Sequence, residues 1–204
     1  LQLYPIYMKL VKYIFFLSCL LLSTIQARPQ SPGGVSSGLA VWLKADAGTS
    51  SAIDGAYLSS WQDQSGNNKH ATQGSGPAQP RFRKGILNGN SAIETTSGTR
   101  FFNIDFSGIS NSNFTIITVV QRTNAMTSQY ICGVQQSSPV GMHLGWVNDN
   151  TCRFGQGSST LNKASTAFSS GSETPRVLIA ESSSTAGRTV SEYLNGVLSS
   201  STDA

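Results

Sequence analysis

The sequence of 204 residues has few charged side chains and no long helical pattern. Asp, Glu, Lys and Arg together make up 12% of the residues, about half of the share that globular proteins usually have. After residue 27, no apolar pattern with a 3.6-residue period extends beyond two turns, so long amphipathic helices are not predicted. This composition, rich in Gly, Ser and Thr, is typical of an extracellular β-protein.

Carboxylates are too sparse for a usual glycosidase site. Glycoside hydrolysis needs two carboxyl groups about 5 to 9 Å apart, which a strand supplies with acidic residues two positions apart on one face. No two acidic residues have this spacing, and no Gly-x-Ser-x-Gly motif accompanies the only histidines, His70 and His143. We expect surface or loop positions for both histidines. The protein is therefore predicted not to be an enzyme, and a glycoside hydrolase is the weakest alternative.

Cysteines and metal-binding patterns are scarce as well. Cys19 lies in an N-terminal apolar segment, whereas Cys132 and Cys152 lie in strand-like segments. In an oxidising compartment these two residues could form a disulfide that joins neighbouring strands. Two buried thiols are the alternative, because the sequence does not give the separation of their Cα atoms. Neither cysteine has the neighbouring ligands that a zinc site requires.

The sequence also has no large basic cluster. Residues 81–84, Arg-Phe-Arg-Lys, are the densest run, and we expect them to form a solvated loop. The formal net charge of +4 falls to +2 without residues 1–27, which contain Lys9 and Lys12 and no acidic residue. Binding to a nucleic acid backbone normally recruits many more cations, so nucleic acid is not a predicted partner.

The N-terminal part has the layout of a secretory signal peptide. Residues 8–27 begin with Met and two lysines, continue with an apolar run over residues 13–22, and end in small or polar residues. That run is too short for a comfortable membrane span of about 20 residues. Residues 1–7 are expected to be a non-native leader, and residues 28–38 a linker rich in Pro, Gly and Ser. We predict a secreted or cell-surface protein whose mature chain has no membrane span.

Short strand-like segments with turn signals fill the rest of the chain. Leu39–Lys44 alternates with a period of two, and the apolar segment Phe114–Gln121 predicts a strand near the centre of a sheet with both faces covered. Asn88-Gly89 and Asn195-Gly196 are strong tight-turn signals between apolar residues. Residues 71–73 and 81–82 are weaker strand candidates. Further strands are predicted on both sides of Asn88-Gly89 and at residues 100–106, 130–134, 141–147, 151–155, 176–180 and 190–194. About ten short strands predict two packed antiparallel sheets or a closed barrel.

Three signals resemble the concanavalin A-like jelly roll, in particular the laminin-G-like domains of secreted bacterial surface proteins. They are LAVWLKADAG at residues 39–48 followed by WQDQSGNN at 61–68, NGNSAI at 88–93 leading to FTIITVV at 114–120, and YLNG at 193–196. The resemblance implies an all-β, two-sheet antiparallel jelly-roll sandwich over residues 39–204. Such domains continue past the last hairpin, so we expect a domain that is truncated at the C-terminus and belongs to a larger protein.

The resemblance also points to calcium, which lectin-like jelly rolls often hold in loops with oxygen ligands. Asp63, Ser65 and Asn67 form an oxygen-rich turn that we name as a candidate calcium site. The alternative is that Asp63 and Asn67 shape a tight turn by bonding to their own backbone.

Sugar binding would need an exposed aromatic ring flanked by amide and carboxylate groups. Trp146, with Asn148 and Asp149 after it and Tyr130 as a neighbour, is the candidate cluster. The alternative is that Trp146 is a core residue, as we expect for Trp42 and Trp61.

Two functions from different classes stay open at this point. One is a non-catalytic recognition or adhesion module that binds a glycan or a cell-surface protein. The other is a structural spacer without a ligand. An exposed Trp146 would favour the first function and a buried Trp146 the second.

Overall fold

The computed structural model describes residues 31–35, 37–95, 99–106, 113–124, 129–133, 142–148, 151–156, 163–167, 175–182 and 190–202. The chain divides into one unit of residues 1–39 and a second of residues 40–204. The predicted signal peptide lies outside the described residues, and the predicted linker contains one 3₁₀ turn, η1 (Pro32–Gly34). No helix within the described ranges is long and apolar enough to cross a membrane.

The unit of residues 40–204 is built from antiparallel strands, as the sequence predicted, with one further 3₁₀ turn, η2 (Gly76–Ala78). The strand order in its sheets is β1-β2, β3-β4, β12-β11-β10-β5 and β6-β7-β8-β9. The strands are β1 (Ser60–Trp61), β2 (Ala71–Thr72), β3 (Arg81–Leu87), β4 (Asn90–Glu94), β5 (Phe114–Val120), β6 (Gln129–Gly133), β7 (Met142–Asn148), β8 (Thr151–Gln156), β9 (Lys163–Ala167), β10 (Arg176–Ser182), β11 (Val190–Leu194) and β12 (Val197–Thr202).

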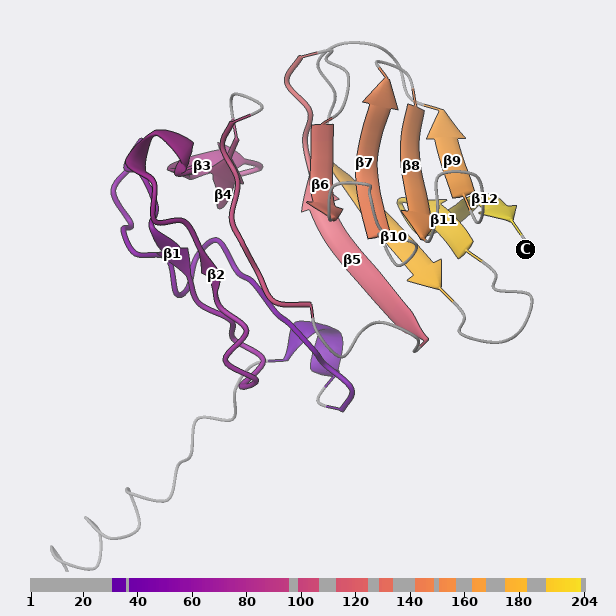
Figure 1. The fold of residues 1–204 in the computed structure, drawn as a ribbon, viewed down its shortest axis with the longest axis horizontal. Helices are drawn as coiled ribbons and strands as arrows, with labels where there is room; N and C mark the ends of the chain where they lie inside the picture. The colour runs from indigo at the N-terminus through magenta and orange to yellow at the C-terminus, as the bar shows by residue number, and fades with distance from the viewer. Residues whose placement is uncertain are drawn as a thin grey trace, which may run out of the picture. The chain divides into compact units, whose positions relative to one another are not determined.

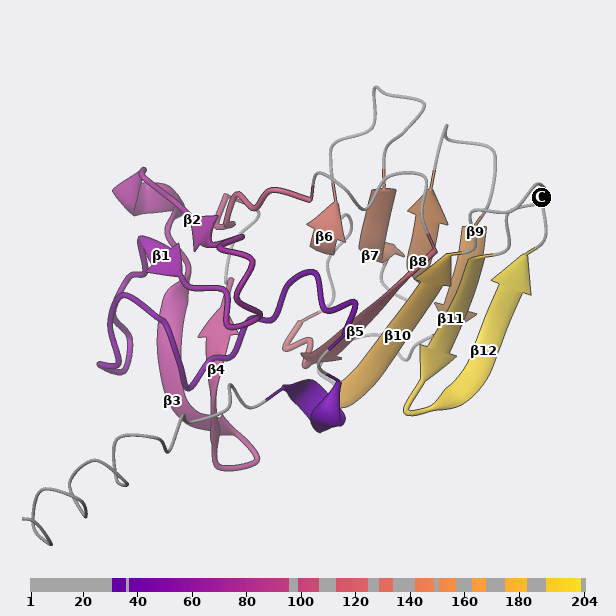
Figure 2. The same ribbon diagram turned by 90° about the horizontal axis from the view of Figure 1, so that it is seen from below.

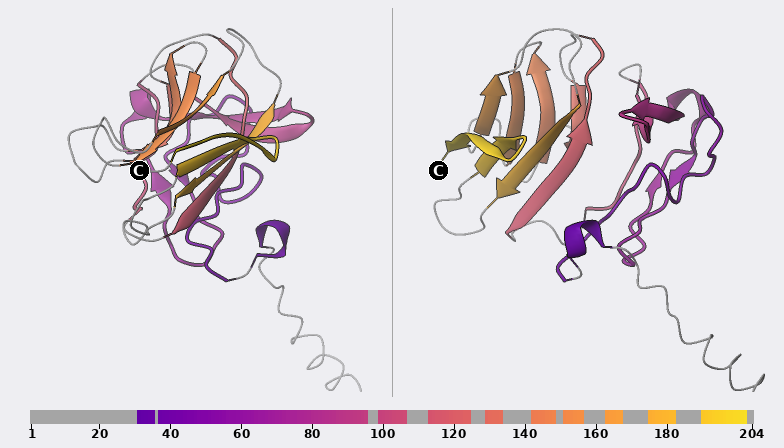
Figure 3. Two further views of the ribbon diagram at one scale, coloured as in Figure 1. Left: turned by 90° about the vertical axis from the view of Figure 1, so that its right-hand side faces the viewer. Right: turned by 180° about the vertical axis from the view of Figure 1, so that it is seen from behind.

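The two four-stranded sheets face each other and enclose a hydrophobic core (Figures 1 and 2). Figure 3 shows the same two layers from the side and from behind. Phe114 of β5 meets Phe154 of β8 edge to face, with ring centroids 6.1 Å apart. The buried core residues come from β7, β8 and β10, and they are Leu144, Trp146, Cys152, Phe154, Leu178 and Ala180. Residues 114–202 therefore have a sandwich-like architecture.

Both predicted tight turns are confirmed. Asn88 and Gly89 join β3 to β4 with φ values of 50° and 80°, and Asn195 and Gly196 join β11 to β12 with 51° and 81°. Positive φ at both central residues fits the type I′ turn, whose twist matches that of a β-hairpin. Asn and Gly are the residues that adopt this conformation at least cost, which explains why the sequence signal was reliable.

Four expectations about individual segments were wrong. Residues 100–106 form no strand and contribute only an isolated bridge between Asn103 and Thr72. Leu39–Lys44 forms no strand, because the N–H and C=O of Trp42 bond to Asp63 and Gln64 of a distant turn rather than to a sheet. Phe114–Val120 is the strand β5, but it lies at the end of its described sheet instead of near the centre. Residues 81–84 belong to strand β3 rather than to a solvated loop.

Cys132 and Cys152 do not form a disulfide with each other. Cys132 lies on β6 and Cys152 on β8, with β7 between them. Neighbouring strands are about 4.8 Å apart, so two strand spacings exceed the roughly 4.4–6.8 Å between Cα atoms that a disulfide spans. The disulfide that the sequence allowed is therefore ruled out by the strand order. Burial raises the pKa of the Cys132 thiol to about 12.

Candidate functional site

The predicted sugar-binding cluster is divided by its own sheet. Trp146 is only 4% exposed and belongs to the core, whereas Tyr130 is 56% exposed. Tyr130 lies opposite Gly145, and its neighbour Gln129 lies opposite Trp146. Because successive residues of a strand point to opposite faces, the two rings lie on opposite sides of the sheet.

Asn148 and Asp149, the other two residues of that predicted cluster, are not seen beside an exposed aromatic ring in the described part of the chain. Asn148 is exposed at the end of β7, beyond a register shift that follows Trp146, and Asp149 lies outside the described residues. The guanidinium carbon of Arg122 lies 5.2 Å from the centroid of the Trp146 ring. The core interpretation of Trp146, which the sequence left open, is the one that the structure bears out.

Asp63 organises the turn that we predicted as a calcium site. Its carboxylate accepts hydrogen bonds from the backbone N–H groups of Trp42 (2.8 Å), Ser65 (2.9 Å) and Lys69 (3.1 Å), and from the Ser65 hydroxyl (2.7 Å). Burial by itself would raise the pKa of the Asp63 carboxyl, but these hydrogen bonds together lower it. Four donors already surround the two oxygens, and their hydrogens occupy positions that a cation would need.

The remaining residues of this turn bond mainly to the backbone. Asn67 Nδ2 donates to the carbonyl oxygen of Ala40 and to Ser65 Oγ, both at 3.1 Å. His70 Nδ1 accepts the N–H of Asp63 at 3.0 Å. No group of three or more His, Cys, Asp or Glu side chains suited to a metal occurs in the described part of the chain. These contacts account for the turn as a structural element, and calcium binding there stays a prediction.

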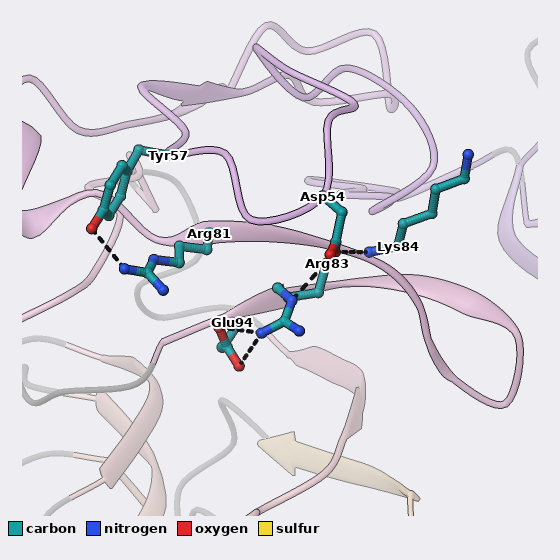
Figure 4. Close-up of polar contacts among 6 residues, drawn as sticks. All are labelled: Asp54, Tyr57, Arg81, Arg83, Lys84 and Glu94. Carbon is teal, nitrogen blue, oxygen red and sulfur yellow. Dashed lines mark hydrogen bonds and ion pairs between the residues drawn. The ribbon is translucent and has the colours of Figure 1, made fainter.

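A different cluster combines charge with an exposed aromatic ring. Tyr57 pairs with Arg81, the first residue of β3, through an isolated β-bridge. The Tyr57 hydroxyl accepts hydrogen bonds from Arg81 Nη2 at 2.7 Å and from Arg100 Nη2 at 3.4 Å. Both guanidinium carbons lie over the Tyr57 ring, 4.8 and 4.9 Å from its centroid. Figure 4 shows Tyr57 and Arg81. We call Tyr57, Arg81 and Arg100 the arginine–tyrosine cluster.

A neighbouring network neutralises the next arginine of the same strand (Figure 4). Arg83 Nη1 lies 3.0 Å from each oxygen of Glu94, and Arg83 Nε lies 3.3 Å from Asp54. The Asp54 carboxylate also accepts the N–H of Lys84 at 2.8 Å, and this bond is the main cause that lowers the pKa of Asp54. Arg83 thus has two carboxylate partners.

The carboxylate of Glu94 forms its ion pair with Arg83 and not with Arg81. Glu94 lies directly opposite Arg81 in the β3–β4 register, yet its side chain reaches diagonally to Arg83. Among the described residues, no carboxylate forms an ion pair with Arg81 or Arg100. Two positive groups therefore converge on one neutral phenol. The hydrogen bond from Arg81, followed by that from Arg100, lowers the pKa of Tyr57 because both stabilise the phenolate.

This arrangement is suited to binding an anionic group. Guanidinium groups form paired hydrogen bonds with carboxylate, sulfate or phosphate oxygens. Tyr57 is 47% exposed and offers ring surface beside them. The sequence showed the basic run at residues 81–84 but did not predict this site. Tyr57 is 24 positions from Arg81 and 43 positions from Arg100, so no local pattern joins the three residues.

Comparisons with known proteins do not identify the chain. No protein-family model matches it, and neither a curated protein nor a solved structure does. The laminin-G-like resemblance and its jelly-roll topology therefore stay predictions. The function has to be inferred from the site itself.

Proposed function

We propose that the protein is a non-catalytic extracellular recognition module that binds acidic glycans through the arginine–tyrosine cluster. The observation that carries this proposal is the convergence of Arg81 and Arg100 on Tyr57 without a carboxylate partner among the described residues. The guanidinium groups would bind a carboxylate or a sulfate of the glycan. The Tyr57 ring would contact the apolar C–H face of an adjacent sugar.

Charge repulsion within the cluster supports an anionic ligand. Two guanidinium groups within hydrogen-bonding reach of one hydroxyl repel each other, and an anion placed between them would relieve this repulsion. An added anion would stabilise Arg83 less, because Glu94 and Asp54 already pair with it. Of the two arginines on β3, Arg83 thus has two carboxylate partners, whereas Arg81 has none among the described residues.

The expected affinity for a single site is low. Ion pairs at exposed positions contribute about 0.2–1 kcal/mol each, and physiological salt screens them beyond about 8 Å. Useful binding would then depend on a polymeric ligand that offers many charged groups to several copies of the protein. This expectation fits adhesion to a polysaccharide better than capture of a small molecule.

A structural spacer without a ligand is the second candidate. The buried side chain of Trp146 favours it, because the aromatic platform that we expected to bind sugar belongs to the core. The spacer differs from the recognition module in one measurable respect. It would bind charged and neutral polysaccharides equally weakly.

The experiment that separates the two compares three polymers at low and high salt. The full chain would be tested against immobilised heparin as a sulfated polymer, polygalacturonate as a carboxylated polymer and dextran as a neutral one. We expect salt-sensitive binding to at least one charged polymer and none to dextran. Arg81→Gln and Arg100→Gln should each weaken this binding several-fold.

Lys84→Gln is the matched control, because it removes one positive charge from β3 outside the cluster. Lys84 engages Asp54 through its backbone N–H and not through its ammonium group. Equal losses for Lys84→Gln and Arg100→Gln would indicate unspecific charge attraction and contradict the proposed site. An unchanged circular dichroism spectrum would show that each variant is folded.

A further inference from the structure

The four strands at the ends of the two larger sheets differ in how their edges are protected. Natural sheets protect an edge with charged residues, with proline or with a bulge, since an unprotected edge invites pairing with another chain. β6 has a register shift after Tyr130 and β12 pairs across a shift after Glu192, while β9 begins with Lys163. Each of these three edges thus carries one of the protective features.

β5 carries none of them. Its sequence, FTIITVV, has no charged residue and no proline, and its seven residues pair with β10 without a register shift. No strand of the described residues pairs with its other edge. β5 is therefore a regular edge, and no strand within the described ranges pairs with its second row of backbone groups.

The outward side chains of β5 are also apolar. Ile117 is 68% exposed and Val119 is 59% exposed. They lie opposite Ile179 and Val177 of β10, which are half-buried on the same side of the sheet. An apolar stripe therefore begins at this edge and continues onto the next strand.

We propose that β5 pairs with β5 of a second copy of this chain, in antiparallel orientation, around a two-fold axis at Ile117. In this register Phe114 lies opposite Val120 and Thr115 lies opposite Val119. Every cross-strand pair joins uncharged residues, most of them β-branched or aromatic, and such pairs are favourable in sheets. The strand is thus complementary to itself, which a two-fold interface requires. The inference is independent of the anion-binding proposal.

A cysteine at the two-fold axis gives the sharpest test. Directly opposed residues of antiparallel strands have Cα atoms about 4.5–5.5 Å apart, which lies within the range that a disulfide spans. Ile117→Cys, in a chain that also carries Cys19→Ser, should therefore form a covalent dimer on mild oxidation. Val197→Cys is the matched control, because Val197 is 70% exposed on β12, at the far end of the same sheet.

We expect at least ten-fold faster cross-linking for Ile117→Cys than for Val197→Cys. Equal rates would mean random collision and would overturn the proposal. A dimer that forms without cross-linking at position 117 would place the interface elsewhere and overturn it as well. If Ile117→Cys does not cross-link and the protein is monomeric, the proposal is overturned. The edge of β5 would then be covered by a segment of the same chain or by nothing.

The association itself can be measured by analytical ultracentrifugation of the full chain. Ile117→Lys places two positive charges opposite each other across the axis, so the dimer should dissociate with an increase of at least ten-fold in Kd. Val197→Lys should leave Kd unchanged. A wild-type chain that stays monomeric at high concentration, or that forms open-ended aggregates, would contradict a closed two-fold pair.

Discussion

Residues 40–106 and residues 114–202 differ in the balance between polar contacts and apolar burial. In the first region, the side chains of Asp63 and Gln73 are buried and bond to loop backbone, and the strands are short or irregular. In the second region, longer strands enclose buried apolar side chains, with Phe154 and Leu178 fully inaccessible to solvent. The first region also buries apolar side chains, among them Leu58 and Phe82, but the hydrophobic core cluster lies in the second region. The comparison indicates that side-chain bonds to loop backbone contribute more to the first region and apolar burial more to the second.

Gln73 illustrates how the first region works. Its side-chain N–H donates to the carbonyl oxygen of Phe101 at 3.1 Å, and its side-chain oxygen accepts the N–H of Ser75 at 3.0 Å. Loop backbone that lacks a sheet partner thereby finds one in a side chain. The arginine–tyrosine cluster belongs to this region, and its Tyr57 is 47% exposed.

The largest expected effect comes from opening the apolar core. Phe154→Ala should lower the free energy of unfolding by about 3–5 kcal/mol, because it removes buried surface and leaves a cavity. Urea unfolding followed by fluorescence would measure this loss. Phe101→Ala, at a ring that is 49% exposed in the first region, should cost less than about 1 kcal/mol. Similar losses for both variants would contradict the assignment of Phe154 to the core.

The next effect comes from the polar anchor of the first region. Asp63→Asn should cost about 1–3 kcal/mol, because the backbone N–H groups of Trp42 and Lys69 lose a charged acceptor. The control Asp46→Asn affects a carboxylate that is 67% exposed, and it should change stability by less than about 0.5 kcal/mol. Thermal unfolding of the two variants against the wild type tests this difference.

Asp63 also gives the stability a defined pH dependence. Its pKa is lower in the folded chain than in the unfolded chain, so the carboxylate stabilises the fold above the unfolded value of about 3.9. This contribution is lost as the pH falls through the lower, folded pKa. The melting temperature of the wild type should therefore fall more steeply in acid than that of Asp63→Asn. Parallel curves would contradict the role of Asp63 as an anchor.

A smaller effect concerns the ionisation of Tyr57. Its pKa is lowered chiefly by the hydrogen bond from Arg81 and then by that from Arg100. Arg81→Gln should raise the pKa of Tyr57, and so should a bound polyanion, because both reduce the positive charge around the phenol. Ultraviolet titration with Tyr57→Phe as the reference would measure it. A pKa that is the same in wild type and Arg81→Gln would contradict the hydrogen bond.

Calcium should have the smallest effect of all. The Asp63 oxygens already accept four hydrogen bonds from Trp42, Ser65 and Lys69, so we expect calcium or a chelator to leave the melting temperature unchanged. Differential scanning calorimetry would measure this. A rise in melting temperature that Asp63→Asn abolishes would instead support the calcium site that the sequence suggested.

Local patterns predicted the features that depend on local conformation. The all-β composition and the two Asn-Gly turns could be identified from the sequence, because only a few residue types tolerate positive φ. The sequence also indicated the basic run on β3 and two alternatives each for Asp63 and Trp146. The sequence did not decide between these alternatives. Whether a residue is buried depends on which elements pack against it, and the local sequence does not show this.

The sequence by itself predicted an antiparallel β-protein with tight hairpins, and it contains no two acidic residues at the two-residue spacing of a strand-borne carboxylate pair. Only the tertiary structure decided that Trp146 faces the core, that β5 lies at an edge and that Arg81 and Arg100 meet at Tyr57. The physical reason is that turn geometry depends on one or two residues. Burial, strand order and charge pairing depend on contacts between residues far apart in the chain.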